Sequence, residues 1–259
     1  MVIMARQRRV YAGAVGRLVS GPSAEDGLVP RTLAFLRRQL PAWRDDPTRP
    51  QANSEKSLNS SLCDFLDHRS RTDLPMARFK HESPQSGTLT VDIGIHGTEE
   101  STAIGVRMYT IYEPFFVLEA KRLPAPRNDR EREYVTGTDR SSGGPTGGIQ
   151  RLKLGLHGGR VDAAAMVGYI EKHLPHHWHG VINGWIDDLI GVTSADGCVW
   201  SSADKLQPIQ VDEGNRTAFS VSMHQRRQGC STPAIAIHHL WVVMDSPARV
   251  PRPGEDTAG

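Results

Sequence analysis

The chain has 259 residues, of which 38% are hydrophobic and 23% are charged, and its formal net charge is +2. This balance excludes a fully disordered chain and an integral membrane protein, and no apolar run approaches the roughly 18–20 residues that a membrane-spanning helix needs. The charged first residues do not resemble a secretion signal, and the three widely spaced cysteines form neither a disulfide framework nor a zinc knuckle. We therefore expect one α/β domain in a reducing, cytoplasmic setting, with no membrane partner.

Helical periodicity marks the first part of the chain. Leucines at helical spacing predict a helix over residues 31–40, and Pro41 is expected to end it. The polar segment that follows has the composition of a linker. Residues 1–52 are therefore interpreted as an N-terminal helical segment and linker.

A second helix is predicted over residues 54–69, with an apolar stripe along one side. Asn53 or Ser54 can cap it by accepting a hydrogen bond from a first-turn amide. Glu55 lies in that first turn, on the same side as the stripe. Its carboxylate either faces a functional site or is there because an acid interacts favourably with a helix N-terminus.

The periodicity then changes to that of strands. A short strand is predicted over 76–82, and a strand with regular alternation over 88–97, joined to the first by a hairpin connection. The segment 101–113 fits either a strand or a short helix. The run over 115–120 is nearly all apolar, as expected for a strand that is buried on both faces.

The rest of the chain alternates helices and strands around one long loop. Residues 124–148 are rich in proline, glycine and charge, and a loop of this length inside a compact domain is usually functional or mobile. Two more helices are predicted, over 149–157 and from 175 to about 190, and three more strands, over 163–170, 217–224 and 234–244. Residues 245–259 are polar and proline-rich, which predicts a disordered tail.

Charged residues within two of these strands predict a site. Asp92 lies between apolar neighbours, and Glu119 and Lys121 lie at the end of the most buried strand, two residues apart and therefore on the same face. A buried charge is costly unless it is paired or binds a metal ion. Two carboxylates and the backbone carbonyl of Ala120 suit Mg²⁺, which prefers oxygen ligands and keeps several waters. The alternative is a structural ion pair between Glu119 and Lys121.

The pattern Asp92…Glu119-x-Lys121, preceded by Glu55 on a helix, resembles the PD-(D/E)XK restriction-endonuclease-like nuclease superfamily. The resemblance implies that Asp92 and Glu119 bind Mg²⁺, for which Mn²⁺ can substitute, and that Glu55 is a further acidic ligand. It implies that Lys121 orients or activates the attacking water. The reaction implied is hydrolysis of DNA phosphodiester bonds by an endonuclease acting in restriction, defence or repair.

The resemblance also implies a fold. It covers about 53–170, where the order of helix, three strands, helix and strand (αβββαβ) is similar to the superfamily's core, with a mixed central sheet flanked by helices. We take 53–174 as this core and 175–244 as an extension of the same domain that contributes a helix and a β-hairpin. Superfamily members commonly cut duplex DNA as homodimers, so duplex DNA and a second copy of the chain are the expected partners.

Four polar side chains are candidates for contacts with the nucleic acid: Gln150, Arg151, Arg122 and Arg127. Gln150 and Arg151 lie at the start of a predicted helix, where backbone amides favour a phosphate. Their alternative is a plain role in starting that helix. Arg122 and Arg127 follow the predicted catalytic strand, at the beginning of the long loop.

Two other functional hypotheses are compatible with the residues. The first is a catalytically inactive member of the same fold that serves as a DNA-binding or protein-interaction module. The second is a zinc-dependent hydrolase that uses a histidine cluster: His173, His176, His177 and His179. That cluster lacks a cysteine pair or a recognised zinc-binding spacing, which favours ordinary surface histidines. His238 and His239 are adjacent in a predicted strand, so one of the two must face inward.

Overall fold

The computed structural model describes residues 27–51, 54–85 and 89–244. Its helices are α1 (Leu28–Arg44), α2 (Glu55–Asp73), α3 (Gly148–Lys153) and α4 (Pro175–Asp187), with short 3₁₀ helices η1 (Asn128–Tyr134) and η2 (Ser202–Asp204). Its strands are β1 (Ala77–Pro84), β2 (Thr90–Gly97), β3 (Ser101–Ile104), β4 (Arg107–Thr110), β5 (Pro114–Leu123), β6 (Ala163–Ile170), β7 (Gln210–Asp212), β8 (Thr217–Gln225) and β9 (Ala234–Val243). The predicted tail over 245–259 and the alternative cap Asn53 lie outside the described residues.

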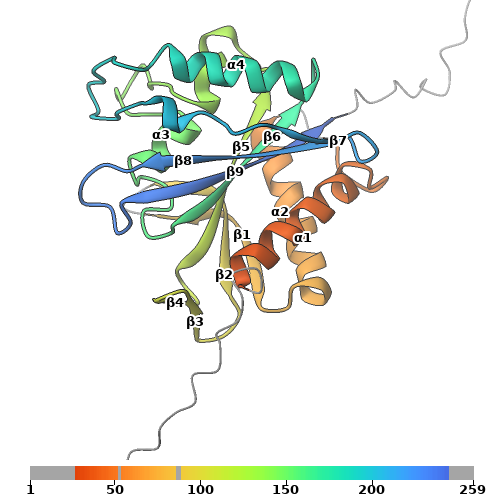
Figure 1. The fold of residues 1–259 in the computed structure, drawn as a ribbon. Helices are drawn as coiled ribbons and strands as arrows, with labels where there is room; N and C mark the ends of the chain where they lie inside the picture. Colours follow the sequence, from red (N-terminus) through yellow and green to blue (C-terminus); the bar gives the residue numbers. More distant parts are fainter. Residues whose placement is uncertain (1–26, 52–53, 86–88, 245–259) are drawn as a thin grey trace, which may run out of the picture.

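Seven strands form one mixed sheet in the order β1-β2-β5-β6-β9-β8-β7, while β3 and β4 form a separate hairpin (Figure 1). β1, β2 and β5 pair antiparallel, β5, β6 and β9 pair in parallel, and β8 pairs antiparallel with β9. The predicted mixed sheet flanked by helices is confirmed. From α2 to β6 the elements follow the predicted order of helix, three strands, helix and strand, with the β3–β4 hairpin inserted before β5.

The C-terminal strands continue this sheet. β8 and β9 form the predicted hairpin, and β9 pairs in parallel with the whole of β6, from Ala163 opposite Ala236 to Ile170 opposite Val243. The predicted extension is therefore built into the central sheet. β9 therefore lies directly beside β6 in the sheet, and β8 lies directly beside β9.

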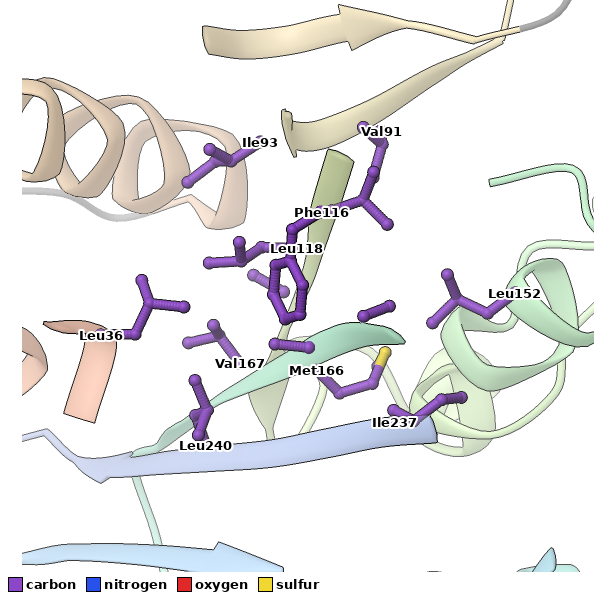
Figure 2. Close-up of a cluster of buried hydrophobic side chains, with 14 of the residues drawn as sticks. Leu36, Val91, Ile93, Phe116, Leu118, Leu152, Met166, Val167, Ile237 and Leu240 are labelled. Carbon is purple, nitrogen blue, oxygen red and sulfur yellow. The ribbon is translucent and has the colours of Figure 1, made fainter. Parts of the chain in front are cut away.

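The core lies on both faces of the central strands. Figure 2 shows Leu36 of α1 and Leu152 of α3 on opposite sides of β5 and β6, whose side chains fill the space between them. Residues 115–121 of β5 are all buried, as the apolar run predicts for a strand covered on two faces. Burial on both sides means that a charged residue in β5 must find its partners inside the protein.

The predicted end of the first helix at Pro41 is wrong, because α1 continues to Arg44 with Pro41 inside it. A proline in a helix interior removes one backbone hydrogen bond and crowds the preceding turn. The residues around it offset that cost, since Leu40 and Trp43 are fully buried and the Trp43 ring lies 5.6 Å from the ring of Tyr169 in β6. Tertiary packing therefore overrides the local stop signal.

Other boundaries also differ from the sequence-based expectation. The ambiguous segment 101–113 forms two strands, and the predicted helix over 149–157 ends at Lys153. Gly155 follows with φ of 70°, a left-handed conformation that favours glycine and turns the chain out of the helix. The helix predicted to about 190 ends at Asp187. Within the described ranges, none of the helices has both the length and the apolar character needed to cross a membrane.

Candidate active site

The predicted pair of carboxylates meets where two strands separate. β2 and β5 pair as far as Ile93 opposite Leu118, and the next residues along are Asp92 and Glu119. Beyond that pair, the contact between the strands is made by the Asp92 side chain, whose Oδ2 accepts a hydrogen bond of 2.8 Å from the backbone N–H of Ala120. The splayed strands therefore place Asp92 beside the Glu119-Ala120-Lys121 segment, as the sequence pattern predicts.

Helix α2 brings the fourth predicted residue to the same place. Ser54 caps the helix by accepting a hydrogen bond from the Ser57 amide, which fixes the first turn. Glu55 Oε1 then accepts a 2.8 Å hydrogen bond from Lys121 Nζ, and its Oε2 accepts one of 3.2 Å from the Arg122 amide. Of the two explanations for Glu55, the structure therefore favours the one in which its carboxylate faces a site.

Glu119 is the most enclosed member of the cluster, with a side chain only 1% exposed. The Arg151 guanidinium contacts its Oε1, and His157 Nδ1 lies 2.6 Å from its Oε2. Lys121 Nζ is 3.9 Å from Oε1, so the lysine is closer to Glu55 than to Glu119. Burial alone would raise the pKa of Glu119, but the nearby charges of His157 and Arg151 lower it to about 2.

Asp92 and Lys121 respond to this environment in different ways. Burial raises the pKa of Asp92 to about 7, and the negative charge of Glu119 adds to the effect. Burial would lower the pKa of Lys121, but Glu55, Asp92 and Glu119 surround it with negative charge and raise that pKa instead. Lys121 is therefore a charged hydrogen-bond donor at neutral pH, while Asp92 is close to its midpoint and would ionise fully beside a cation.

The predicted nucleic-acid contacts have different surroundings. Gln150 is 3% exposed; its Oε1 accepts from the amides of Gly137 and Gly147, and its Nε2 donates to Asp196. These contacts favour the alternative for Gln150, a structural role at the start of α3, because its amide group is already used inside the fold. Arg151 does not extend to the surface as a free side chain, because its guanidinium donates a hydrogen bond to the Glu119 carboxylate.

The two arginines after β5 have acidic neighbours. Arg122 forms two hydrogen bonds of 2.6 Å with Glu171, and Arg127 pairs with Asp129 at 2.8 Å. The Arg127 side chain is exposed, and the Arg122 side chain is partly buried. Arg122 is the next-to-last residue of β5, and Arg127 follows the strand at the beginning of the loop.

His157 is the site residue that the sequence did not reveal. On the predicted helix over 149–157, Arg151 and His157 would lie on different sides. The helix instead ends at Lys153, and left-handed Gly155 and Gly158 turn the chain so that His157 reaches the carboxylate held by Arg151. The run of glycines around His157 is the signal that could have located this turn.

The donor atoms of the predicted metal site are of the chemical type that binds Mg²⁺. Across the three described ranges, no group of three or more His, Cys, Asp or Glu side chains is arranged to hold a metal ion. The predicted magnesium ligands are Asp92, Glu119, Glu55 and the Ala120 carbonyl, all hard oxygen donors. Glu55 does not join the two other carboxylates as a ligand, because its two oxygens accept hydrogen bonds from Lys121 and the Arg122 amide. Asp92 accepts only one hydrogen bond from the described residues, whereas both Glu119 oxygens have partners. A cation can therefore take Glu119 Oε1 only when Arg151 moves.

The histidines of the zinc hypothesis do not form a comparable site. The rings of His173 and His177 stack with centroids 4.2 Å apart, and His179 Nε2 lies 2.9 Å from the Gln207 carbonyl oxygen. These contacts use the imidazoles as packing and backbone partners. They match the sequence-based view that the cluster consists of ordinary histidines at a helix start.

A second polar cluster is buried between η1, η2, β8 and β9, and we call it the histidine network. Its six members are Tyr134, Asp204, Ser222, His224, His239 and Trp241. Asp204, His224 and Ser222 have the atom order of an acid–base–nucleophile triad: Asp204 Oδ1 is 2.7 Å from His224 Nδ1, and Ser222 Oγ is 2.6 Å from His224 Nε2. Ser222 and His224 are both fully buried, so no substrate reaches the hydroxyl.

The chain was compared with models of protein families, with curated proteins and with solved structures, and none of the three comparisons found a match.

Proposed function

We propose that the protein is a Mg²⁺-dependent deoxyribonuclease of the PD-(D/E)XK restriction-endonuclease-like superfamily, acting as an endonuclease in restriction, defence or repair. One observation carries this proposal. Asp92, Glu119, Lys121 and Glu55 come from three different elements and meet where β2 and β5 separate. A structural ion pair would need one acid and one base, whereas this cluster brings three carboxylates together with Lys121, Arg151 and His157.

The chemistry follows from the kinds of group that are present. Hydrolysis of a phosphodiester needs an in-line water, and negative charge builds up on the phosphate oxygens. When bound by Asp92, Glu119 and the Ala120 carbonyl, Mg²⁺ supplies positive charge beside those oxygens and makes a nearby water more acidic. The side chains around Glu119 exclude bulk water, which strengthens each of these interactions.

Lys121 has a defined part in this proposal. Its ammonium is charged, only 9% exposed and anchored by Glu55 at 2.8 Å. A protonated lysine cannot accept a proton, so its role is to donate a hydrogen bond that orients the attacking water. Glu55 acts through Lys121 as a positioning residue, because it fixes the direction of the ammonium group.

One observation favours a second candidate function. Glu119 is almost fully buried, and both its oxygens are already bound by Arg151 and His157. A carboxylate held in this way would also suit a catalytically inactive nuclease fold that binds DNA or another protein. The two candidates differ in whether a divalent cation can displace Arg151.

The experiment is incubation of supercoiled plasmid with purified protein and Mg²⁺, Mn²⁺ or EDTA. Cutting by the wild type only in the presence of metal, and loss of cutting in Lys121→Met, is the expected result. Discrete fragments would indicate recognition of a DNA sequence, and nicking would indicate weaker selectivity. Metal-independent cutting, or full activity in Lys121→Met, would overturn the proposal. A shift of the plasmid in a binding gel without cutting would favour the inactive module.

The expected partners can be tested with the same protein. Duplex DNA is the proposed substrate, and a homodimer would let two sites cut both strands. Sedimentation of the protein with and without a short duplex measures the stoichiometry. Two chains on each duplex supports the dimer, and one chain on each duplex argues for single-strand nicking.

A further inference from the structure

We propose that Arg151 is an exchangeable counter-ion at Glu119, which gives up Oε1 to the divalent cation and then contacts a phosphate of the DNA. The inference rests on the proposed function and assigns to Arg151 a role in regulating the same site. It concerns a contact between α3 and β5 that the sequence pattern of the superfamily does not contain.

The two partners of Glu119 are not equivalent. His157 is 1% exposed and its Nδ1 is 2.6 Å from Oε2, so the imidazole fixes the carboxylate from the interior. The Arg151 side chain, which contacts Oε1, is 20% exposed and so reaches solvent. Oε1 is therefore the oxygen that a cation can approach, and Arg151 is the partner that can leave.

The hydrogen bonding of Arg151 is incomplete. Its Nε is buried and has no hydrogen-bond partner among the described residues. A guanidinium with five donors normally pairs them in a fork, and a carboxylate or a phosphate accepts two at once. The Arg151 guanidinium donates to a single carboxylate oxygen, from Nη2 to Glu119 Oε1, so its other N–H groups remain as donors for a second anion.

The charges of the cluster explain why a cation competes with Arg151. Glu55, Asp92 and Glu119 are acidic, and Lys121, Arg151 and the imidazole of His157 face them. Arg151 supplies part of the positive charge that offsets these acids. Without it that share of the positive charge would be missing, and a divalent cation would replace it. Arg151 thus supplies, in the absence of metal, part of the charge that the metal would bring.

Release of Arg151 would place a guanidinium beside the scissile phosphate. Arginine is the residue best suited to bind a phosphate through two parallel hydrogen bonds, and a positive donor there stabilises the charge that develops during hydrolysis. The same side chain would then hinder metal binding and assist cleavage. A residue that only supports the fold would affect both quantities in the same direction.

The test measures the two quantities separately in wild type, Arg151→Ala and Arg151→Lys. Calorimetric titration with Mn²⁺ in the absence of DNA gives the affinity for metal, and plasmid cleavage at saturating Mg²⁺ gives kcat and KM. We expect Arg151→Ala to bind Mn²⁺ about tenfold more tightly and to cleave about 100-fold more slowly, as for loss of one transition-state donor. Arg151→Lys keeps the charge, so its Mn²⁺ affinity should stay near that of the wild type, with cleavage between the other two.

A matched control is Arg38→Ala, since Arg38 pairs with Asp73 at the opposite end of α2 from Glu55. It should change neither Mn²⁺ affinity nor cleavage. Unchanged or weaker Mn²⁺ binding by a folded Arg151→Ala, beside an active wild type, would refute the counter-ion role and leave the proposed nuclease standing. If Arg151→Ala does not fold, Mn²⁺ affinity reduced in Arg151→Lys refutes the role in the same way. A wild type that neither binds Mn²⁺ nor cuts DNA would instead reject the proposed function.

Discussion

Helix α3 directs two basic side chains into two different buried polar clusters, and only one of the clusters has complete hydrogen bonding. Arg151 contacts Glu119 at the candidate active site, while Lys153 contacts Asp204 of the histidine network. Each acid also binds an imidazole: His157 at 2.6 Å from Glu119, and His224 at 2.7 Å from Asp204. The two clusters have similar components and differ in what is left unpaired.

The histidine network has one consistent arrangement of protons. Trp241 Nε1–H donates to the Tyr134 oxygen, and the Tyr134 hydroxyl donates to His239 Nδ1. His239 Nε2–H then donates to Ser222 Oγ, whose own proton goes to His224 Nε2. The chain ends where His224 Nδ1–H donates to Asp204, whose pKa is about 2 because hydrogen bonds from His224 and Lys153 outweigh the effect of burial. Each imidazole is neutral in this arrangement and has a partner on both nitrogens.

The candidate active site leaves groups without partners. Within the described ranges, His157 Nε2 and Arg151 Nε are buried and have no hydrogen-bond partner, and Asp92 is near its midpoint of protonation. Buried polar groups without partners are uncommon in native proteins and call for an explanation. A complete network stabilises one structure, whereas an incomplete one keeps donors and acceptors for a ligand. We therefore assign the ligand to the first cluster and stability to the second.

The largest expected effect that separates the two clusters is that of Asp92→Asn. The amide can still accept the hydrogen bond from Ala120, but it cannot supply a negative charge to Mg²⁺. We expect cleavage to fall at least about 1,000-fold, equivalent to roughly 4 kcal/mol of barrier. Because a buried charge is removed, the unfolding free energy at neutral pH should stay the same or rise. Plasmid cleavage and urea denaturation measure the two effects, and lost stability with retained cleavage would reverse the assignment.

Ser222→Ala should show the opposite behaviour. It leaves His224 Nε2 and His239 Nε2 without a partner inside the protein, and two unpaired buried groups cost about 2–4 kcal/mol of unfolding free energy. Cleavage per folded molecule should stay within about threefold of the wild type, since the network does not contact Glu119. The matched control is Ser220→Ala on the same strand, which loses one hydrogen bond to Gln207 and about 1 kcal/mol. Equal losses in the two variants would show that the network is not cooperative.

The histidine network should also lose stability in acid. Burial lowers the pKa of His239 well below its usual value and lowers that of His224 as well. Below about pH 6.5 the unfolded chain takes up protons that the folded network does not, so this stabilisation is present above that pH and is lost as the pH falls. The difference in unfolding free energy between the wild type and His239→Phe should therefore shrink by up to about 1.4 kcal/mol for each unit by which the pH falls. Urea denaturation from about pH 7.5 to about pH 5 measures it, and a difference that stays constant over this range would contradict the prediction.

The residues of the candidate site that the sequence revealed are those defined by local rules. Glu119 and Lys121 are two apart on a buried strand, so strand alternation puts them on one face. Asp92 differs, because the pattern of the nuclease superfamily, and not periodicity, implied that its strand lies beside theirs. Strand alternation likewise predicts that one of His238 and His239 faces inward, and His239 is fully buried. The two inferences from strand alternation need only the identity of each element and the face on which a residue lies.

The parts that the sequence did not reveal depend on long-range packing. The contact of His157 requires the helix to end at Lys153, and the histidine network requires β9 to pair with β6 across a long separation in the chain. Pro41 remains inside α1 because burial of its neighbours outweighs a local stop signal. In each case the deciding energy comes from a contact that the local pattern does not contain.

The smallest expected effect tests how firmly α2 holds Glu55. Ser54 accepts the Ser57 amide at the first turn, and loss of such a cap costs about 1 kcal/mol of unfolding free energy. If the cap also fixes Glu55 against Lys121, Ser54→Ala should lower kcat by about threefold to tenfold. The change in KM should be smaller than the change in kcat. Ser54→Asp, which keeps an acceptor at the cap, should restore kcat, whereas a purely structural role would lower stability and leave the kcat of the folded protein unchanged. The rescue therefore decides whether the helix start belongs to the candidate active site or only to the fold.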